Sequence, residues 1–426
     1  MNSADIIIIG AGAAGLMAAA ELSKAGQKVI VLEARDRVGG RVYTITDNAF
    51  EQHIEAGAEF IHGNLKTTLS LLGEAGLPYD ETAGRFFRFE NNHWKNEDDE
   101  NIDWTELMNK LNALKEDTTI AQFLNTNFNN EKYAKLRQSI KAFAEGYDAA
   151  DITKASAFAL RKEWEQEDEP QYRVTNGYIQ LINFLKDKCQ ANGSVIHLST
   201  IVKKAEWNNN KVKITTKDAL TYEANKLVVT VPVSILQSDK NAEAFIEFIP
   251  SIHSYTDAYK QIGYGSVIKI LLQFDKAFWE DEIKNAGFIL SDQKIPTWWT
   301  QLPSHNSLLT GWKAGASVNE LRNASNELIL QQALESLASI FKKSGEEIQK
   351  HLSAYKVFNW SNDPFSLGGY SYATIQTQEA KKLLNTPLHK TIYFAGEALA
   401  EDSAAGTVEA ALSSGFETAQ KALKDN

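Results

Sequence analysis

A glycine-rich turn near the N-terminus constrains the fold more than any other feature of the sequence. Gly10, Gly12 and Gly15 lie where the β-rich residues 5–9 pass into the alanine-rich residues 13–25. Between a strand and a helix, the first glycine permits a tight turn, the second admits a pyrophosphate to the backbone, and the third lets the helix pack on the strand. The free N–H groups at the start of such a helix favour an anion. The sequence therefore predicts a βαβ unit that binds a dinucleotide.

Glu33 directly follows the second predicted strand, residues 28–32. A carboxylate at this place hydrogen-bonds a ribose hydroxyl and repels a phosphorylated ribose. Glu33 thus supports dinucleotide binding, whereas the glycine fingerprint leaves both NAD and FAD open.

Length and composition limit what else the chain can be. Its 426 residues exceed one ordinary core, because single cores stop growing near roughly 250–300 residues, and we expect two domains. The net charge of −11 opposes a broad contact with phosphate backbones, so nucleic acid is not an expected partner. Cys189 is the only cysteine and the eight histidines lack metal-ligand spacing, so we expect neither an intramolecular disulfide nor a metal site.

The apolar N-terminus lacks the basic segment of a signal peptide. Elsewhere the sequence has no run of about 18 uncharged apolar residues, the length that would cross a membrane. We expect a soluble, cytoplasmic protein without a membrane span.

The remaining periodicity predicts alternating helices and strands. Residues 65–189 have a mostly helical pattern, and further helices are predicted over 323–341 and 408–423. Short β-rich runs bounded by Asn, Gly or Asp predict strands over residues 195–198, 211–216, 226–232, 266–274 and 391–398. Strands therefore recur after the helical region, as in a chain that returns to its first sheet.

Three motifs resemble the flavin-containing amine oxidases, both monoamine oxidase and polyamine oxidase types, and specifically soluble members of the bacterial kind. LEARDRVGGRV, residues 32–42, resembles the extension that follows the fingerprint in these FAD enzymes and that nicotinamide-binding domains usually lack. EAGAEFIHG, residues 55–63, is similar to the family segment beside the flavin ring. YFAGEALAEDSAAGTVEAALSSG, residues 393–415, resembles the second FAD motif. Because motifs lie at both ends, the resemblance covers the whole chain.

The resemblance implies an α/β fold in which a discontinuous Rossmann-like FAD-binding domain is joined to an α+β substrate-binding domain, as in the p-hydroxybenzoate hydroxylase-like flavoproteins. The FAD-binding domain would comprise residues 1–75, 193–233 and 385–426. The substrate-binding domain would comprise residues 76–192 and 234–384.

Fingerprint and resemblance together predict the cofactor site. Arg35 and Arg41 would offset the diphosphate charge beside two successive glycines, and Glu397 would reach the ribityl chain. The start of the helix after Gly406 would stabilise negative charge on the reduced flavin. The predicted cofactor-binding residues are Gly10, Gly12, Ala14, Gly15, Glu33, Ala34, Arg35, Gly40, Arg41, Gly57, Ala58, Glu59, Phe60, Val202, Trp360, Gly396, Glu397, Gly406, Thr407 and Val408.

Lys269 is the predicted catalytic residue. It lies in GSVIKILLQFDKAFW, residues 265–279, which resembles the family segment whose lysine contacts flavin N5 through a water. Its alternation with Ile268 and Ile270, taken alone, favours an outward-pointing lysine on an edge strand. The resemblance instead implies that Lys269 positions that water and assists reoxidation by oxygen.

Four residues are predicted to face the substrate. Tyr370, in WSNDPFSLGGYSYA, matches one wall of an aromatic cage, and an aromatic face attracts or orients an amine. His62 matches a substrate-facing position of polyamine oxidases, although taken alone it better suits a hydrogen-bonded packing role. Thr407 replaces the second cage tyrosine, which leaves the two-tyrosine cage in doubt, and Trp299 is a candidate for another wall. Gly369 replaces the cysteine that bonds FAD in monoamine oxidases, which implies non-covalent FAD.

The resemblance implies oxidation of a small amine to an imine, which water hydrolyses to an aldehyde or ketone, with O2 reduced to H2O2. An L-amino acid oxidase is an alternative, but it needs a cation where residues 59–61 read Glu-Phe-Ile. A desaturase or protoporphyrinogen-type oxidase, a histone lysine demethylase with added modules, and a flavoprotein that binds FAD for structure are further alternatives.

Overall fold

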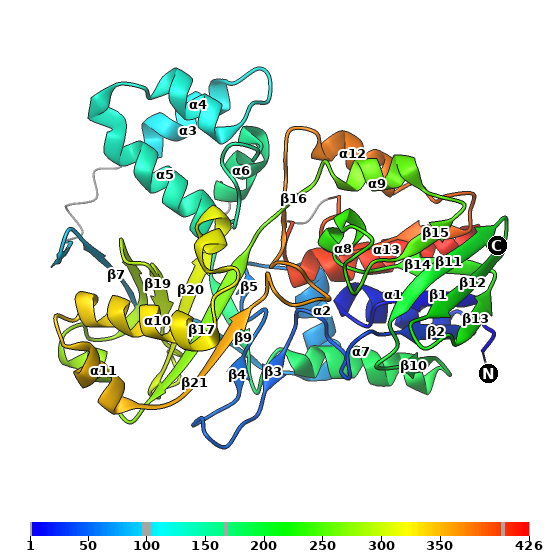
Figure 1. Ribbon diagram of the computed structural model, residues 1–426, viewed down its shortest axis with the longest axis horizontal. Coiled ribbons are helices and arrows are strands. Elements are labelled where there is room, and N and C mark those ends of the chain that lie inside the picture. The colour runs from blue at the N-terminus through cyan, green and yellow to red at the C-terminus, as the bar shows by residue number, and fades with distance from the viewer. Residues whose placement is uncertain (1, 96–103, 166–168, 402–404, 426) are drawn as a thin grey trace.

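The computed structural model describes residues 2–95, 104–165, 169–401 and 405–425, and its first unit is built on a parallel sheet (Figure 1). The sheet has the strand order β10-β2-β1-β14-β23, and every neighbouring pair is parallel. Its bounds are β1 (Ile6–Ile9), β2 (Val29–Leu32), β10 (Val195–His197), β14 (Lys226–Val229) and β23 (Ile392–Phe394). The predicted strand–helix–strand start is confirmed.

Two layers cover this sheet, one on each face. Ile6 and Ile8 face a helical layer, whereas Ile7 and Ile9 face a second sheet, as the two-residue period of a strand requires. The helices are α1 (Ala13–Lys24), α2 (Lys66–Ala75), α7 (Ile179–Ala191) and α13 (Val408–Lys424). The second sheet has the order β13-β12-β11-β15, with β11 (Val202–Asn208), β12 (Lys211–Thr216), β13 (Thr221–Ala224) and β15 (Glu247–Ile249).

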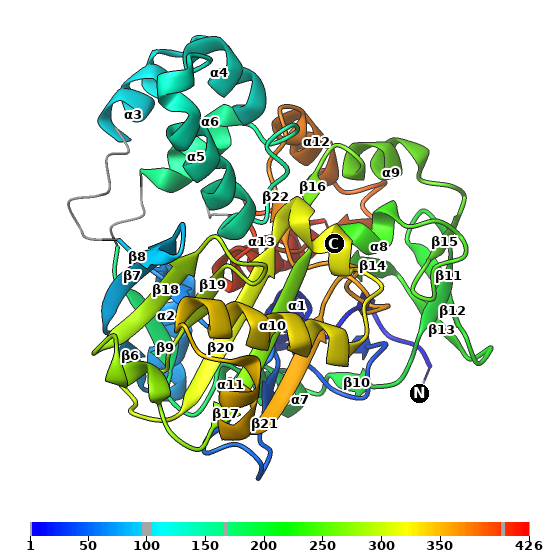
Figure 2. The same cartoon turned by 60° about the vertical axis from the view of Figure 1, so that its left-hand side comes forward.

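The other part of the chain is built on a seven-stranded sheet with the order β21-β17-β20-β19-β18-β7-β8. This sheet is antiparallel except at the β18–β7 pair. Figure 2 shows α10 (Asn326–Ile340) and α11 (Gly345–His351) lying across it. The strands are β7 (Arg85–Glu90), β8 (His93–Trp94), β17 (Val267–Phe274), β18 (Ala286–Ser291), β19 (Thr297–Trp299), β20 (Leu308–Ala314) and β21 (Leu352–Asn359).

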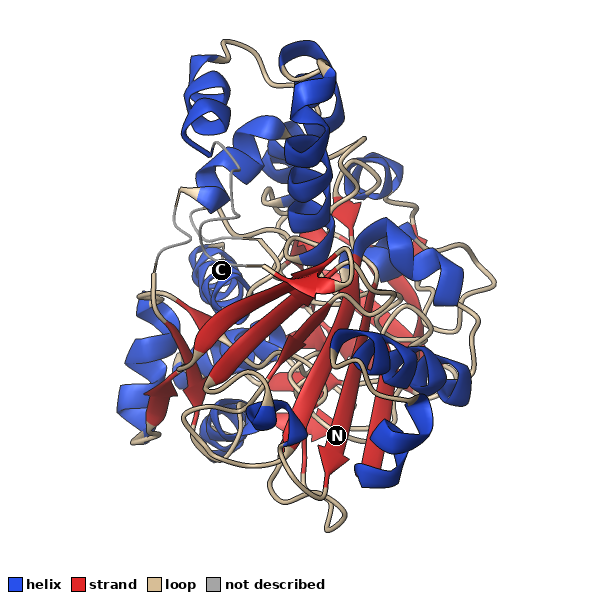
Figure 3. Ribbon diagram, turned by 90° about the vertical axis from the view of Figure 1, so that its left-hand side faces the viewer, coloured by secondary structure: helices blue, strands red, loops and turns tan. Residues whose placement is uncertain are grey.

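A group of helices stands at one end of this sheet, at the top of Figure 3. It consists of α3 (Trp104–Ala113), α4 (Ile120–Asn127), α5 (Ala134–Gly146) and α6 (Ala157–Trp164), whose apolar faces form a core of their own. No helix in the described ranges is long and apolar enough to cross a membrane.

Short elements connect these layers. The remaining strands are β3 (Thr44–Ile45), β4 (Ile54–Glu55), β5 (Ile61–His62), β6 (Tyr79–Glu81), β9 (Gln171–Val174), β16 (Gly263–Tyr264) and β22 (Ser371–Tyr372). The remaining helices are α8 (Val233–Gln237), α9 (His253–Tyr259) and α12 (Thr377–Leu384), with 3₁₀ turns at Glu131–Tyr133, Phe278–Asp281 and Gly315–Leu321.

Most predicted elements are found within a residue or two, but β14 ends three residues before the end of the predicted strand 226–232, and α10 begins three residues after the start of the predicted helix 323–341. Two further predictions are wrong in detail. The region 65–189 also contains β6, β7, β8 and β9, which are short and partly exposed and so lack a clear buried face. The predicted strand 391–398 ends at Phe394, because Gly396 turns the chain at a φ of 153°.

The proposed domain boundaries stay a prediction. Two segments that they assign to the substrate-binding part pack with the first unit. Helix α7 contributes to the core beneath α1, and β15 pairs with β11.

Helix α13 packs closely on α1 because both carry small residues at their contact. A Cβ added at Gly415 would lie 2.3 Å from the Ala14 carbonyl oxygen. The predicted small-residue C-terminal helix therefore depends on this glycine for its approach to α1.

Replacing Gly415 by Ala is expected to destabilise the fold by about 1–3 kcal/mol, because the added methyl overlaps backbone that cannot move without separating the helices. Gly73→Ala is the matched control: Gly73 is also helical, and its added Cβ meets nothing within 4 Å. That variant is expected to be neutral or stabilised by about 0.5–1 kcal/mol. Thermal unfolding measures the stability of both variants. Equal changes in stability would contradict the close packing of α13 on α1 at Gly415.

Candidate functional site

The fingerprint turn is tightly packed at one glycine and open at another. A Cβ at Gly15 would lie 2.0 Å from the Gly10 carbonyl oxygen, whereas one at Gly12 would meet nothing closer than the Gly39 oxygen at 3.9 Å. Gly12 pairs with Gly39, and Gly40 follows at a φ of 57°. These glycines leave an open backbone face at the start of α1, as a pyrophosphate requires.

Glu33 is fixed beside that face. Its Oε2 accepts from the Ala11 backbone N–H at 2.7 Å, and its Oε1 accepts from the Arg35 N–H at 2.9 Å. Each oxygen retains a lone pair for a ribose hydroxyl. The carboxylate is thus buried, oriented and still able to accept, which fits the predicted ribose contact.

Arg35 contacts two side chains of the segment after Trp360. Its Nη2 pairs with the Asp363 carboxylate and donates to Ser366 Oγ at 3.0 Å. Sequence analysis assigned Arg35 to the diphosphate, a role that stays a prediction, whereas the observed contact joins the segment after Glu33 to the segment after Trp360.

The Arg41–Glu397 ion pair joins three distant parts of the chain. Arg41 Nη1 donates to Glu397 Oε1 at 2.9 Å and to the Gly369 carbonyl at 2.7 Å. Glu397 also accepts from Ser371 Oγ at 2.6 Å and from the Gly406 N–H at 2.9 Å. Burial would lower the pKa of Arg41, but Tyr264 and Glu397 raise it overall. Both carboxylate oxygens of Glu397 therefore hold protein donors, and its predicted ribityl contact stays a prediction.

The predicted flavin-ring segment is tied to Arg41 through the backbone. A Cβ at Gly57 would lie 1.9 Å from the Arg41 carbonyl oxygen, which accepts from the Ala58 N–H at 3.0 Å. Trp360 Nε1 donates to the Ala56 carbonyl at 2.9 Å. The Gly57 position thus brings two predicted cofactor segments into direct contact.

Lys269 is buried, with its side chain 1% exposed, on the inner strand β17 between β20 and β21. The outward edge-strand interpretation of Lys269 is wrong, because that strand has neighbours on both sides. Lys269 Nζ donates to Glu59 Oε2 at 2.7 Å and to the Gly57 carbonyl at 3.1 Å. Its ammonium therefore reaches the predicted flavin-ring segment.

Glu59 gathers a cluster that sequence analysis did not foresee. Besides Lys269, it accepts from Arg173 Nε at 2.9 Å and from Trp299 Nε1 at 3.0 Å. Burial would raise the pKa of Glu59, but Lys269 and Arg173 lower it to about 2. We call Glu59, Lys269, Arg173 and Trp299 the Glu59 cluster. Arg173 is a lone cation in β9, and nothing in its local sequence indicates this contact.

Aromatic rings extend from this cluster to Tyr370. The ring centroids of Trp299 and Trp312 are 5.9 Å apart, and the Trp312 and Tyr370 rings are stacked at 6.5 Å. Phe60 lies 5.5 Å from Trp299 on the other side. A Cβ at Gly406 would lie 2.8 Å from the Tyr370 ring, so the C-terminal motif reaches the same place.

His62 and Tyr370 meet the helical group through Tyr147, a residue absent from the sequence prediction. Tyr147 Oη lies 3.2 Å from His62 Nδ1, and the Tyr370 hydroxyl donates to the Tyr147 carbonyl. Burial lowers the pKa of His62 to about 4, so the imidazole is neutral near neutral pH. Thr407 caps α13 by accepting from the Ala410 N–H at 3.1 Å. Its predicted contact with substrate stays a prediction.

Several other predicted cofactor residues lie in or beside the first unit. Val202 is buried between the two sheets at the start of β11, and Val408 begins α13 and packs against the core around α1. A Cβ at Gly396 would meet nothing within 4 Å, so the backbone is open there. A Cβ at Gly369 would lie 2.5 Å from Val267 Cγ2, so a cysteine thiol could not be added there without displacing Val267.

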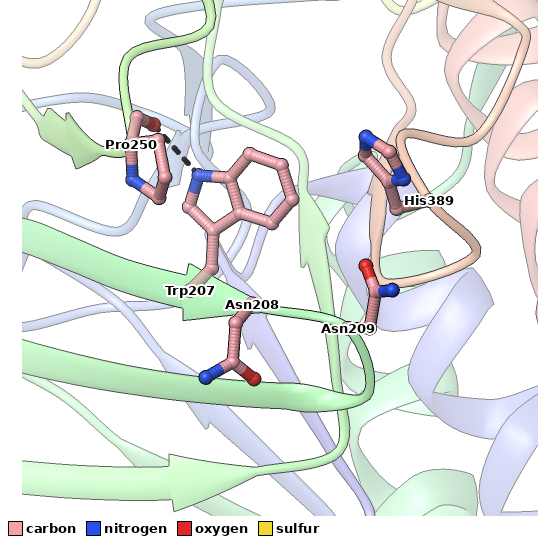
Figure 4. Close-up of a pocket in the computed structure, with 5 residues that line it drawn as sticks. All are labelled: Trp207, Asn208, Asn209, Pro250 and His389. Atoms are coloured by element: carbon pink, nitrogen blue, oxygen red, sulfur yellow. Dashed lines mark hydrogen bonds between the residues drawn. The ribbon is translucent and has the colours of Figure 1, made fainter.

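A separate hollow of about 470 Å³ lies away from these residues (Figure 4). Trp207 Nε1 donates to the Pro250 carbonyl at its edge at 2.8 Å. Its lining, Trp207, Asn208, Asn209, Pro250 and His389, includes none of the predicted site residues, so we do not assign the function to it.

Comparisons with known proteins agree over nearly the whole chain. A family model described as flavin containing amine oxidoreductase matches residues 13–423. Polyamine oxidase 4 of Oryza sativa subsp. japonica is 28% identical over 99% of this chain and 88% of its own length. Lysine-specific histone demethylase 2 of Homo sapiens is 28% identical over 93% of this chain and 51% of its own length. Wild-type putrescine oxidase bound to putrescine has a TM-score of 0.82 at 20% identity and 99% coverage of both chains, which confirms the predicted fold class.

The half-buried carboxyl of Glu55 is expected to give the site a pH dependence. Glu55 accepts a hydrogen bond from Thr44 Oγ1 at 2.8 Å and another from the Tyr178 backbone N–H at 2.7 Å. Burial raises its pKa to about 7, against the effect of the Tyr178 bond and of Lys269. The folded state therefore binds more protons here than the unfolded state between the ordinary value of 4.5 and about 7, and this contribution to stability is lost as pH rises through about 7.

Glu55→Gln lacks this titration and keeps an amide oxygen for Tyr178. Its melting temperature relative to the unsubstituted protein is expected to rise by a few degrees between about pH 5 and about pH 8. Thermal unfolding of the FAD-loaded proteins at the two pH values measures the difference. A difference that does not change with pH would contradict the assignment to Glu55.

Proposed function

Because the chain belongs to the flavin-containing amine oxidoreductases, we propose that it oxidises a small amine to an imine with non-covalently bound FAD, and that O2 is the final electron acceptor. The observation that carries this proposal is the buried Lys269 ammonium beside Gly57, next to the aromatic row that leads from Trp299 to Tyr370. These groups combine a fixed cation with aromatic faces next to the predicted cofactor segments.

The residues present fit FAD. The open backbone face at Gly12 and Gly40 suits the diphosphate, and Glu33 has lone pairs for the ribose. Gly369 has no thiol to offer as a covalent link, and the only cysteine, Cys189, is buried in the core around α1. When bound, FAD would take a hydride equivalent from the carbon next to the amine nitrogen.

The chain's own residues have simpler tasks. The Tyr370 ring, backed by Trp312, would orient the amine, and neutral His62 would neither repel a cationic substrate nor act as a strong acid. Lys269 has one N–H beyond those given to Glu59 and Gly57, which would hold a water at the flavin side. Water would then hydrolyse the released imine to an aldehyde or ketone, and O2 would leave as H2O2.

We propose polyamines and diamines as the first substrate class to test. The support is the similarity to a plant polyamine oxidase, together with the fold of putrescine oxidase. Thr407 in place of a second cage tyrosine leans the same way. A cytoplasmic location and the lack of a nucleic-acid partner stay predictions.

The alternatives have less support. An L-amino acid oxidase needs a cation for the substrate carboxylate, but Arg173 donates from Nε to Glu59, from Nη1 to the Leu302 carbonyl and from Nη2 to the Thr300 carbonyl. The chain aligns with only 51% of the human demethylase. A histone substrate therefore lacks a specific observation in its favour.

The reaction class is tested by mixing FAD-loaded protein anaerobically with polyamines, diamines, monoamines and L-amino acids. One amine class is expected to bleach the flavin band near roughly 450 nm, and air is expected to restore it with release of H2O2. If dithionite bleaches the flavin band but none of the amines does, the protein binds FAD and the proposal of amine oxidation is contradicted.

Lys269→Met is expected to slow reoxidation of the reduced flavin by about tenfold or more, because a fixed cation stabilises the charge that develops on oxygen. FAD binding should be retained, since Lys269 donates to Gly57 and Glu59 rather than closing the fingerprint turn. Stopped-flow mixing with O2 measures the rate. Reoxidation at the original rate would remove Lys269 from this role.

A further inference from the structure

Glu59 was predicted to be a cofactor-binding residue, but its contacts point to another task. We propose that Glu59 is a positioning residue whose carboxylate sets the direction and charge of the Lys269 ammonium and, through it, the reaction of the reduced cofactor with O2. The proposal rests on the role of Lys269 in the proposed function, and it requires no particular amine substrate.

The contacts of Lys269 leave its ammonium one free direction. An ammonium has three N–H donors, and Lys269 gives one of them to Glu59 Oε2 at 2.7 Å and a second to the Gly57 carbonyl at 3.1 Å. With two directions taken, the third is determined. Glu59 therefore decides where the remaining donor of Lys269 points.

The same carboxylate holds an aromatic wall. Glu59 Oε1 accepts from Trp299 Nε1 at 3.0 Å, and Lys269 Nζ lies 5.4 Å from the centre of the Trp299 ring. One carboxylate thus fixes both the cation and the first ring of the row leading to Tyr370. A change at Glu59 would reach both.

Glu59 is itself anchored from the opposite side. Arg173 Nε donates to Glu59 Oε1 at 2.9 Å, while its two other nitrogens donate to the Leu302 and Thr300 carbonyls at 3.0 Å each. The side chains of Glu59 and Lys269 are 3% and 1% exposed. The backbone after β19 therefore fixes Arg173, Arg173 fixes Glu59, and Glu59 fixes the position of the Lys269 ammonium.

Stability alone is a weak reason for this arrangement. Removing two cations and a carboxylate from water costs several kcal/mol per ion, and buried ion pairs often stabilise no more than apolar replacements of the same volume. A preorganised cation is useful where negative charge develops during reaction. In reoxidation, O2 gains two electrons and two protons and leaves as H2O2, with the electrons and one proton from the reduced cofactor and the other proton from solvent.

Other charged groups near Lys269 enter the pH dependence. Glu55, on β4, acts on Lys269 electrostatically and has a pKa raised to about 7 by its burial. Arg173, on β9, faces it across Glu59, and His53 lies within electrostatic range of Glu59. Glu59 is the carboxylate in direct contact with the ammonium, so its removal should affect the charge of Lys269 most.

The test measures reoxidation of photoreduced, FAD-loaded protein by O2 from about pH 6 to about pH 10, without any amine. The unsubstituted protein is expected to keep its rate through the alkaline range. Glu59→Gln keeps the size and loses the charge, and is expected to be about tenfold slower at the alkaline end, because an ammonium buried without its carboxylate loses its proton more readily. A Glu59→Gln profile parallel to that of the unsubstituted protein would overturn the proposal.

A double variant separates positioning from a general loss of structure. If Glu59 acts through Lys269, the Glu59→Gln/Lys269→Met protein should be no slower than Lys269→Met alone. Additive slowing would overturn the proposal. Glu145→Gln is the matched control, since Glu145 is also a buried carboxylate paired with a lysine, Lys141, at 2.5 Å, and its reoxidation profile should not change.

Glu59→Asp covers the case in which Glu59→Gln does not retain FAD. This variant keeps the negative charge but moves it away from Lys269 by the length of one methylene. Its reoxidation rate is expected to be several-fold lower than that of the unsubstituted protein and to fall at a lower pH. An unchanged profile would overturn the proposal here as well. All these measurements start from photoreduced FAD and use no amine, so a failure to oxidise any amine would contradict the proposed function and leave this inference standing.

Discussion

The ion pair between Arg41 and Glu397 holds together segments that are more than three hundred residues apart in sequence. Arg41 donates to the Gly369 carbonyl as well, and Glu397 accepts from Ser371 and Gly406. The fingerprint extension, the Tyr370 segment and the start of α13 therefore meet at one pair of charges. If Arg41 were lost, Glu397 would remain as a buried carboxylate without its cation, which is costly. The site depends on this closure before any substrate group can be placed.

Backbone proximity extends that closure to the Glu59 cluster. Gly57 lies so close to the Arg41 carbonyl that a side chain is excluded, and the Gly57 carbonyl then accepts from Lys269. The Arg41–Glu397 pair and the Glu59 cluster are thus linked by a few residues of one segment. One group joins the parts that surround the predicted cofactor site, and the other places a cation and an indole ring beside it. A small movement of the Arg41 backbone would therefore change the position of the Gly57 carbonyl that Lys269 contacts.

The sequence predicted those parts whose contacts are local or carried by a motif. The strand, glycine turn and helix from Ile6 to Lys24 depend on near neighbours and on a two-residue period, and they were predictable. The direction of Lys269 was not predictable from periodicity, because all residues of β17 are buried and alternation then carries no signal. The partners of Glu59 lie 114, 210 and 240 residues away, and no local pattern specifies them. Tyr147 was missed for the same reason, since α5 meets His62 only in the folded chain.

In the proposed reaction, the separation of charge from the aromatic row would let one site serve both halves of an amine oxidation. Glu59 offsets one of the two positive charges of Lys269 and Arg173, so the Glu59 cluster keeps one net positive charge. The rings of Trp312 and Tyr370 and the neutral imidazole of His62 offer a surface without net charge. An amine must be uncharged at the nitrogen whose neighbouring carbon is oxidised, whereas O2 reduction benefits from a nearby positive charge. In the proposed reaction, the net positive charge of the Glu59 cluster would serve the reduction of O2, and the uncharged surface of Trp312, Tyr370 and His62 would serve the amine.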